Sequence, residues 1–594
     1  MLPALLLAFV LIKHRVRTSI ALILTLTLGF FSYVFSLFVF PFLSINVFSV
    51  IASNFIQIIP VILSLMLVAK TPRIDVEEKV TGRFYSLWRE TLYLFPAVTV
   101  LTVVFMSFLR FGWGSMAFAM NGDSRNHVWF SRFMIEQQGL DASSAAYYPV
   151  LPDGMVALTR SGLNFFEDRS TNPLTLDLVS IGSMTLTVII LMSLIHAQIA
   201  KSIFKKEHPL RVMSVCVIAF FPLGGLISKV ALSDGFYPAL FASLTLQLFI
   251  FAGWQYLRTN IQNEKTILLA SLFMLTPLIV STWTLLGIIP AASFLLLPRK
   301  VKKTIFTMVR SQRPIQISIF FSIILCYLNL FPLVSKGAAS NYVKLAGAIT
   351  LPPSKLLLGI LIAFLIYLAW RAYRDSALDK RYLASILFTI LLTFLFLASL
   401  QDNGNYWNYY PAKFTWIALI SVFPFLFSIG IQDFSKNPRV LTIIMIPTLV
   451  LSSWSITSSP WVKFDLLNNM KPQSIIYGGW YSPGSDSVNL VLNYGKKGVP
   501  VAFWDLSDPS GDRLANFWLS TYLPARFDNP VLATNELRDW AYWEIPGQTS
   551  SLCDLLVNSD LRWKVVTRNE NLRDQLMGVC GEEVPLNEFV IHSP

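Results

Sequence analysis

Long runs of apolar residues, separated by short polar segments, dominate the chain from its beginning to about residue 460. A run of about 20 apolar residues is long enough to cross the hydrocarbon core of a bilayer as a helix. The pattern therefore predicts a polytopic α-helical membrane protein. The single runs lie near residues 19–42, 47–69, 91–111, 175–198, 212–231, 236–257, 317–335, 355–370, 383–400, 414–431 and 440–457.

The apolar run 266–297 is longer than one span and is interrupted by Thr276-Pro277 and by Ser281–Thr284. The segment that follows it, Arg299–Lys303, is the most basic connection in the protein. Cytoplasmic loops of membrane proteins are enriched in Lys and Arg. We therefore predict that 266–297 folds as a hairpin of two short helices, which returns the basic segment to the cytoplasmic side. This choice gives about 13 transmembrane helices.

The distribution of charge along the chain is consistent with this topology. Only 14% of the residues are charged and the mean hydropathy is +0.58, whereas a soluble domain carries roughly a quarter charged residues. The net charge of +13 would suggest nucleic acid by itself, but the basic residues fall between apolar runs, so no nucleic-acid partner is expected. The predicted cytoplasmic connections are 13–18, 70–90, 199–211, 258–265, 298–316, 371–381 and 432–439.

Two domains follow from these patterns. Residues 1–460 are predicted to form the transmembrane domain, which includes a long outside loop at 112–174. From residue 461 charged residues become frequent, and short β-like runs alternate with helical ones, so 461–594 is predicted to be a small extracytoplasmic α/β domain. The strands are expected at Ser474–Tyr477, Val501–Trp504 and Trp563–Thr567, and the helices at 485–494, 512–522, 550–557 and 571–577.

The tail also contains two of the four cysteines. Cys553 and Cys580 lie on the last two predicted helices, on either side of the last predicted strand. They can pair as a disulfide if the tail faces an oxidising compartment, and two free buried thiols are the alternative. No Cys/His cluster with metal-binding spacing is present, and no metal is expected.

The outside loop 112–174 contains the first candidate for chemistry, Asp123. We predict that Asp123 lies just before the first turn of an interfacial helix. The carboxylate can cap this helix and can also face a cleft, and the local sequence leaves both roles open. The apolar face of the helix is predicted to lie on the bilayer and consists of Phe130, Phe133 and Met134.

Five other polar residues extend this candidate site, four of them on the outside. Arg125 and His127 follow Asp123 in the same helix, and a second cluster in the loop contains Asp153. For His127, a role in acceptor binding and a plain surface position in the loop are both open. Asp234 lies in a very short outside turn, where Ser-Asp-Gly is also ordinary turn chemistry. Lys229 lies deeper in the preceding span, where an unpaired charge is expensive, so Asp234 or a bound anion is a reasonable partner.

The segment Tyr409–Lys413 is the third candidate. Lys413 enters a span from the outside, against the usual bias of basic residues, and simple snorkelling explains this position. The functional interpretation is a cation that binds a lipid-linked phosphate at the outer interface. Tyr409 and Tyr410 suit either an interfacial belt or a surface on which a sugar stacks.

Together these features resemble the type C (GT-C) superfamily of membrane glycosyltransferases. The resemblance rests on the acidic residue of the first outside loop, the interfacial helices, the dozen or so spans, the hairpin at 266–297 and the soluble tail. Tyr409–Lys413 resembles a Tyr-Tyr-x-x-Lys segment of actinobacterial cell-envelope arabinofuranosyl- and mannosyltransferases. Val565–Arg568, followed by Cys580, is similar to the tails of uncharacterised actinobacterial relatives.

The resemblance implies an inverting glycosyltransferase that uses a polyprenyl-phosphate sugar and no cofactor, on the outer face of the plasma membrane. A glycan or glycolipid would be the acceptor, with Asp123 as general base. Cations for the leaving phosphate would be Arg125, Lys229 and Lys413, and the remaining substrate contacts would come from His127, Asp153, Asp234, Tyr409 and Tyr410. Many members have two neighbouring acids where this chain has Gly-Asp-Ser-Arg, which argues against a metal bound by an acidic pair.

Two other classes of function remain open at this point. A transporter or lipid-linked glycan flippase would need charged residues buried at mid-membrane along a pathway. The charges here cluster at one face, which favours the enzyme. A catalytically silent relative that scaffolds envelope enzymes is the other alternative, and the sequence excludes neither.

Overall fold

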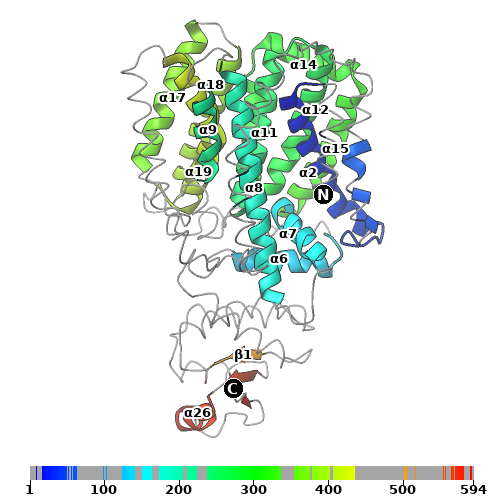
Figure 1. Ribbon diagram of the computed structural model, residues 1–594, viewed down its shortest axis with the longest axis vertical. Helices are drawn as coiled ribbons and strands as arrows, with labels where there is room; N and C mark the ends of the chain where they lie inside the picture. The colour runs from blue at the N-terminus through cyan, green and yellow to red at the C-terminus, as the bar shows by residue number, and fades with distance from the viewer. Residues whose placement is uncertain are drawn as a thin grey trace.

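A computed structural model of the chain shows a bundle of long helices. It describes residues 16–49, 124–140, 150–163, 173–204, 211–223, 237–335, 354–374, 378–401, 406–434, 501–504, 563–567, 569–580 and 589–591, together with residues 9, 51–52, 55–56, 58–62, 98, 102, 516, 553 and 556. Helices account for most of these residues (Figure 1).

Seven of the described helices are long and apolar enough to cross a membrane. The chain is therefore a helical, membrane-embedded protein, and the predicted spans at these positions are confirmed. The predicted span near 47–69 is described only in pieces as far as residue 62, and the predicted span near 91–111 only at residues 98 and 102. The predicted span near 440–457 lies outside the described residues. The seven helices are α2 (Thr18–Phe42), α8 (Pro173–Ile203), α11 (Tyr237–Arg258), α12 (Gln262–Thr282), α15 (Arg313–Ser335), α18 (Leu378–Ser399) and α19 (Tyr409–Phe434).

Helix α17 (Ser354–Arg374) has 21 residues and covers the predicted span 355–370, but it is not among these seven, and shorter elements complete the described part of the bundle. The remaining elements of the bundle are α6 (Ser124–Glu136), α7 (Val150–Leu163), α9 (Arg211–Phe220), η5 (Phe221–Leu223), η6 (Thr284–Gly287), α13 (Ile288–Leu296) and α14 (Arg299–Ser311). Of the predicted span 212–231, only the first part is described, as α9 followed by the 3-10 turn η5.

The hairpin predicted at 266–297 differs from expectation in its first arm. Helix α12 has 21 residues and is long enough to span by itself, so the prediction of two short helices is wrong for this arm. Pro277 lies inside α12 without ending it, since packing against neighbouring helices can compensate for a proline within the membrane. The chain turns at Trp283 and returns through η6 and the short α13.

Hydrogen bonds and ion pairs bring several predicted cytoplasmic connections together at one end of the bundle, here called the α14 end. Arg17 binds Glu264 at the start of α12. The Arg258 guanidinium donates to the carbonyl oxygen of Ser202 at 2.9 Å and lies 3.9 Å from the Asp379 carboxylate. Helix α14 lies at the same end (top of Figure 1). Helices α6 and α7 lie toward the opposite end, here called the α6–α7 end.

The described part of the C-terminal region contains a three-stranded parallel sheet in the order β1-β2-β3. Strands β1 (Val501–Phe503) and β2 (Lys564–Thr567) confirm two predicted strands, and α26 (Leu572–Cys580) confirms a predicted helix. Strand β3 (Phe589–Ile591) was not predicted. Cys553 and Cys580 form a disulfide with their Cα atoms 5.5 Å apart. The predicted strand at 474–477 lies outside the described residues.

Candidate functional site

Helix α6 begins at Ser124, directly after Asp123 in the sequence. The predicted helix is therefore confirmed, whereas Asp123 itself lies outside the described residues. The prediction for the apolar face of α6 is wrong, because Phe130 and Met134 are buried within the protein core and do not face the bilayer. Phe133 is partly buried against the same core. The helix is thus packed firmly on the bundle.

Three buried polar side chains join α6 to the bundle. Nδ1 of His127 in α6 lies 3.0 Å from Oδ1 of Asp153 in α7, and the Tyr237 hydroxyl donates to the same oxygen. The rings of His127 and Tyr237 meet edge to face, with their centroids 5.1 Å apart. A carboxylate only accepts hydrogen bonds, so Nδ1 carries the proton. This group is called the His127–Asp153–Tyr237 network below.

The network is completed by a hydroxyl and by the position of the carboxylate in its helix. Ser131 Oγ donates to the carbonyl oxygens of His127, at 2.8 Å, and of Asp153, at 3.1 Å. Asp153 lies in the first turn of α7, where the helix dipole favours negative charge. Its side chain has no exposed surface. Charge-assisted hydrogen bonds in such an enclosed place are strong and directional, so the network holds α6, α7 and the start of α11 in one arrangement.

Helix α7 also fits closely against α2. The Tyr33 hydroxyl of α2 donates to the carbonyl oxygen of Gly154. A Cβ atom at Gly154 would lie 2.5 Å from Cδ1 of Leu37 and 3.2 Å from Cε1 of Tyr33. A side chain at position 154 would therefore force the end of the Leu37 side chain to move, and glycine lets the two helices approach this closely without that shift.

Asp177, just before the spanning part of α8, forms a second anchor. Its carboxylate accepts from Nε of Arg132 at 2.7 Å and from Nε of Arg160 at 2.9 Å. These residues belong to α8, α6 and α7, so one buried acid joins three helices. No role was predicted for Asp177, although a lone acid at the edge of an apolar run is a usable signal of a buried partner.

The predicted Tyr409–Lys413 cluster occupies the first turn of α19. Lys413 is half-buried, and its Nζ donates to the Tyr409 hydroxyl at 3.0 Å. The Tyr410 ring stacks on Trp283 at the turn of the α12–α13 hairpin, with centroids 6.2 Å apart. This stacking fixes the start of α19 against the tip of the hairpin and leaves the ammonium group of Lys413 near the helix end.

Helices α11 and α19 are neighbours that run in the same direction. Ser243 Oγ donates to the carbonyl oxygen of Ile417 at 3.5 Å, and Gln247 Nε2 to that of Ile420 at 2.9 Å. A residue of α11 is therefore level with the residue of α19 that lies 173–174 positions later in the sequence. At this offset Tyr237, which begins α11, is level with the first turn of α19. Packed helix axes lie about 8–10 Å apart, so the His127–Asp153–Tyr237 network and Lys413 lie at the same end of the bundle.

The remaining predicted site residues are not placed by the structure. Lys229 and Asp234 lie outside the described residues, and for Arg125 only the helical backbone is described. Of the predicted set, the structure brings together His127 with Asp153, and Tyr409 with Tyr410 and Lys413. Tyr237, to which the sequence analysis assigned no role, is the link between α7 and α11.

A third polar group lies inside the bundle. Nδ1 of His196 in α8 lies 3.1 Å from the carbonyl oxygen of Ile218, and its Nε2 lies 2.6 Å from Nε2 of Gln247 in α11. Both residues are fully buried. Each ring nitrogen of His196 has a partner, and the contact with Gln247 joins α8 to α11.

Comparison with known proteins adds no assignment, since no family model and no curated protein matches this chain.

Proposed function

We propose that the protein is an inverting glycosyltransferase of the cell envelope that takes its sugar from a polyprenyl-phosphate donor. The observation that carries this proposal is the anchoring of α6. The helix that starts directly after Asp123 is held on the bundle by the buried His127–Asp153–Tyr237 network. Tyr237 of this network begins α11, and its level in the bundle is that of the first turn of α19, which carries Lys413. Sugar transfer from a lipid phosphate needs a carboxylate near the acceptor hydroxyl and a cation near the leaving phosphate. Asp123 before a fixed helix and Lys413 at the same end of the bundle are the two candidates for these roles.

The proposed reaction assigns one role to each group. Asp123 removes the proton of the acceptor hydroxyl, whose oxygen attacks the anomeric carbon of the donor sugar. The bond from that carbon to the phosphate oxygen breaks, and its electron pair leaves with polyprenyl phosphate. Attack from the opposite face inverts the configuration. The leaving phosphate gains a negative charge, which Lys413 stabilises together with Arg125 and Lys229.

His127 and Asp153 act in this proposal as positioning residues. Both are buried and bonded to each other, and they hold the first turn of α6 while Asp123 does the chemistry. A base displaced by about 1 Å can cost a hundredfold in rate, so a rigid anchor beside it has a direct catalytic value. Tyr409, Tyr410 and Asp234 remain candidates for contacts with the sugar or the lipid phosphate.

The proposed topology places the α14 end in the cytoplasm, because Lys and Arg concentrate there. The α6–α7 end, Lys413 and the C-terminal α/β domain of residues 461–594 then lie outside the plasma membrane. The disulfide between Cys553 and Cys580 supports this side for the tail, since disulfides persist in oxidising compartments. The complete bundle is proposed to contain about 13 spans.

The test of the proposed function is Asp123→Asn in the full-length protein reconstituted in liposomes. Sugar transfer is measured from a panel of polyprenyl-phosphate hexoses and pentoses to an envelope glycolipid extract. Asn caps a helix as well as Asp does, so a pure capping role predicts unchanged transfer. Loss of the base predicts a rate at least about a hundredfold lower. Glu136→Gln, at the other end of α6, is the matched control and should keep the wild-type rate.

Two further results bear on the assignment. Lys413→Ala should raise KM for the donor, and Lys413→Arg should restore part of the affinity because it keeps the cation. Absence of transfer by the wild-type protein from every donor would contradict the proposal and would favour the silent scaffold.

A transporter or lipid-linked glycan flippase is the second candidate, and the buried His196–Gln247 pair is the observation that favours it, since buried ionisable groups often mark transport pathways. Translocation of a fluorescent lipid-linked glycan without any new glycosidic bond, abolished by His196→Leu, would support this alternative.

A further inference from the structure

Helix α14 lies across the end of the bundle. It makes an angle of 107° with the preceding segment Thr284–Leu296. Its inner side is apolar, with Ile305 and Met308 buried, and the Tyr256 hydroxyl of α11 lies 3.7 Å from the sulfur of Met308. The segment was predicted only as a cytoplasmic connection, 298–316. It is a helix seated by one face on the ends of the spans.

The outer side of α14 is strongly basic. The helix has no acidic residue, and four of its five cations are exposed: Arg299, Lys300, Lys303 and Arg310. The fifth, Lys302, is half-buried and donates to the carbonyl oxygen of Leu295 at 2.8 Å. Within the part of the chain that the structure describes, no carboxylate forms an ion pair with any of them.

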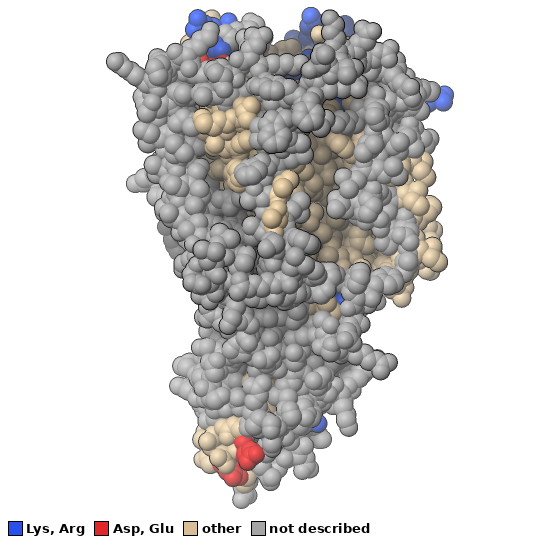
Figure 2. All heavy atoms as spheres, in the orientation of Figure 1, with Lys and Arg blue, Asp and Glu red and all other residues tan. Residues whose placement is uncertain are grey.

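Other cations at the same end behave differently. Arg17 binds Glu264, and Arg371 and Lys380 both bind Asp433. Figure 2 shows Lys and Arg side chains gathered at the upper end of the molecule. The described acids of this end are thus paired with other cations and do not neutralise the positive charges of α14. These charges attract anions.

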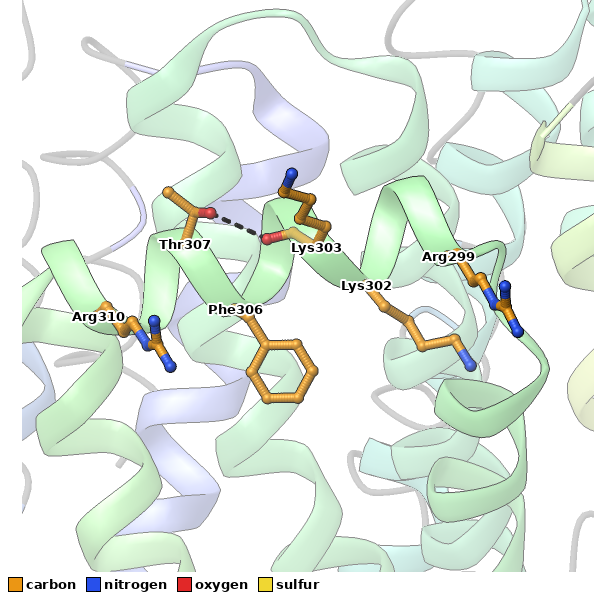
Figure 3. Close-up of a pocket in the computed structure, with 6 residues that line it drawn as sticks. All are labelled: Arg299, Lys302, Lys303, Phe306, Thr307 and Arg310. Atoms are coloured by element: carbon orange, nitrogen blue, oxygen red, sulfur yellow. Dashed lines mark hydrogen bonds between the residues drawn. The ribbon is translucent and has the colours of Figure 1, made fainter.

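Four of the five basic residues of α14, all except Lys300, line an open hollow of about 440 Å³. Figure 3 shows Lys302, Phe306 and Arg310, at four-residue spacing, on one side of the helix together with Arg299. Lys303 and Thr307 project from the other side. The ring of Phe306 is 56% exposed among these cations. One stripe of the helix therefore combines positive charge with exposed aromatic surface.

We propose that this stripe of α14 binds the anionic headgroups of membrane lipids. Lys and Arg beside a membrane attract anionic lipid, and an amphipathic helix with basic and aromatic residues is suited to the headgroup region. The exposed Phe306 distinguishes a lipid surface from a soluble phosphate, because only the former gives the ring an apolar environment. This inference is independent of the reaction that the protein catalyses.

The experiment measures thermal unfolding of the full-length protein in zwitterionic micelles during titration with short-chain phosphatidylglycerol, and separately with phosphatidylcholine and inorganic phosphate. Ligands that bind only the folded state raise Tm. We expect phosphatidylglycerol to raise Tm, with a smaller rise at high salt because salt screens exposed charges. The other two ligands should leave Tm nearly unchanged. An equal effect of inorganic phosphate or phosphatidylcholine would overturn the proposal.

Two charge-matched variants identify the surface. In the first, the three cations of the stripe, Arg299, Lys302 and Arg310, are changed to Gln. In the second, three exposed cations of the same end that lie outside the hollow are changed to Gln: Arg313, Arg374 and Arg381.

The first variant should bind phosphatidylglycerol at least about tenfold more weakly, since each cation at an anionic surface contributes roughly a fivefold gain. The second variant should stay within about threefold of wild type, and equal loss in the two would reduce the effect to net charge and overturn the site. If the first variant does not fold, Phe306→Ser and Arg310→Gln, tested singly, take its place. Wild-type affinity in both would overturn the site.

Discussion

Helices α6 and α14 are both amphipathic and lie toward opposite ends of the bundle, but they differ in whether their polar residues are enclosed or exposed. His127 of α6 is enclosed and bonded to Asp153, and Arg132 is bonded to Asp177. The cations of α14 are mostly exposed and have no described acid as a partner. Enclosed polar groups hold a helix in one place, whereas exposed ones remain available to a ligand. At the α6–α7 end the polar residues therefore fix the position of a helix, and at the α14 end they give a surface that attracts anions.

The largest expected effect is at the centre of the His127–Asp153–Tyr237 network. Asp153→Leu removes the acceptor shared by His127 and Tyr237 and leaves both polar groups buried. We expect it to lower the free energy of unfolding by about 3–5 kcal/mol, measured by denaturant unfolding in micelles. Asp153→Asn keeps one acceptor oxygen and should lose clearly less. Wild-type stability in Asp153→Leu would show that other contacts hold α6.

The two ends of α11 allow a direct comparison, because each has a buried or partly buried tyrosine hydroxyl. Tyr237→Phe removes a hydrogen bond to a carboxylate and should cost about 1.5–3 kcal/mol. Tyr256→Phe removes only a contact with the sulfur of Met308, a weak acceptor, and should cost less than about 0.5 kcal/mol. Equal losses, measured in the same unfolding experiment, would contradict the difference between the two ends.

The close approach of α7 to α2 gives the next effect. Gly154→Ala places a methyl group 2.5 Å from Cδ1 of Leu37, and the overpacking should cost about 1–3 kcal/mol. Gly162 lies in the same helix with no atom within 4 Å of an added Cβ. Gly162→Ala should therefore be neutral or stabilise the helix by up to about 1 kcal/mol. If Gly162→Ala were as harmful as Gly154→Ala, the cause would not be the contact with α2.

The smallest effect on stability is expected at α14. Arg310→Gln in lipid-free micelles should change the free energy of unfolding by less than about 0.5 kcal/mol, as surface substitutions generally do. The same unfolding curves provide the measurement. A loss similar to that of Asp153→Leu would reveal a structural partner for Arg310 and would end the contrast between the two helices.

Several features of the site follow from local sequence, and others do not. The start of α6 directly after Asp123 was predicted closely, because helix caps act over a few residues. Helix α19 begins at Tyr409, five residues before the predicted run 414–431. Helix α14 was predicted only as a connection, although Val301, Ile305 and Met308 recur at helical spacing. The role of Tyr237 could not be predicted from local sequence, because its partner is 84 residues away.

The sequence by itself determined the class of protein and most of the described spans. Backbone polar groups in a bilayer must bond within the segment, so a long apolar run has one stable form, the helix. Tertiary structure alone decided which acids meet which bases, and which apolar phase covers each amphipathic face. Periodicity marks the face of α6 as apolar, but both lipid and protein interior satisfy that pattern. The packing of Phe130 and Met134 into the core, together with the bonds of His127 and Arg132 to buried acids, shows that α6 is fastened to the bundle.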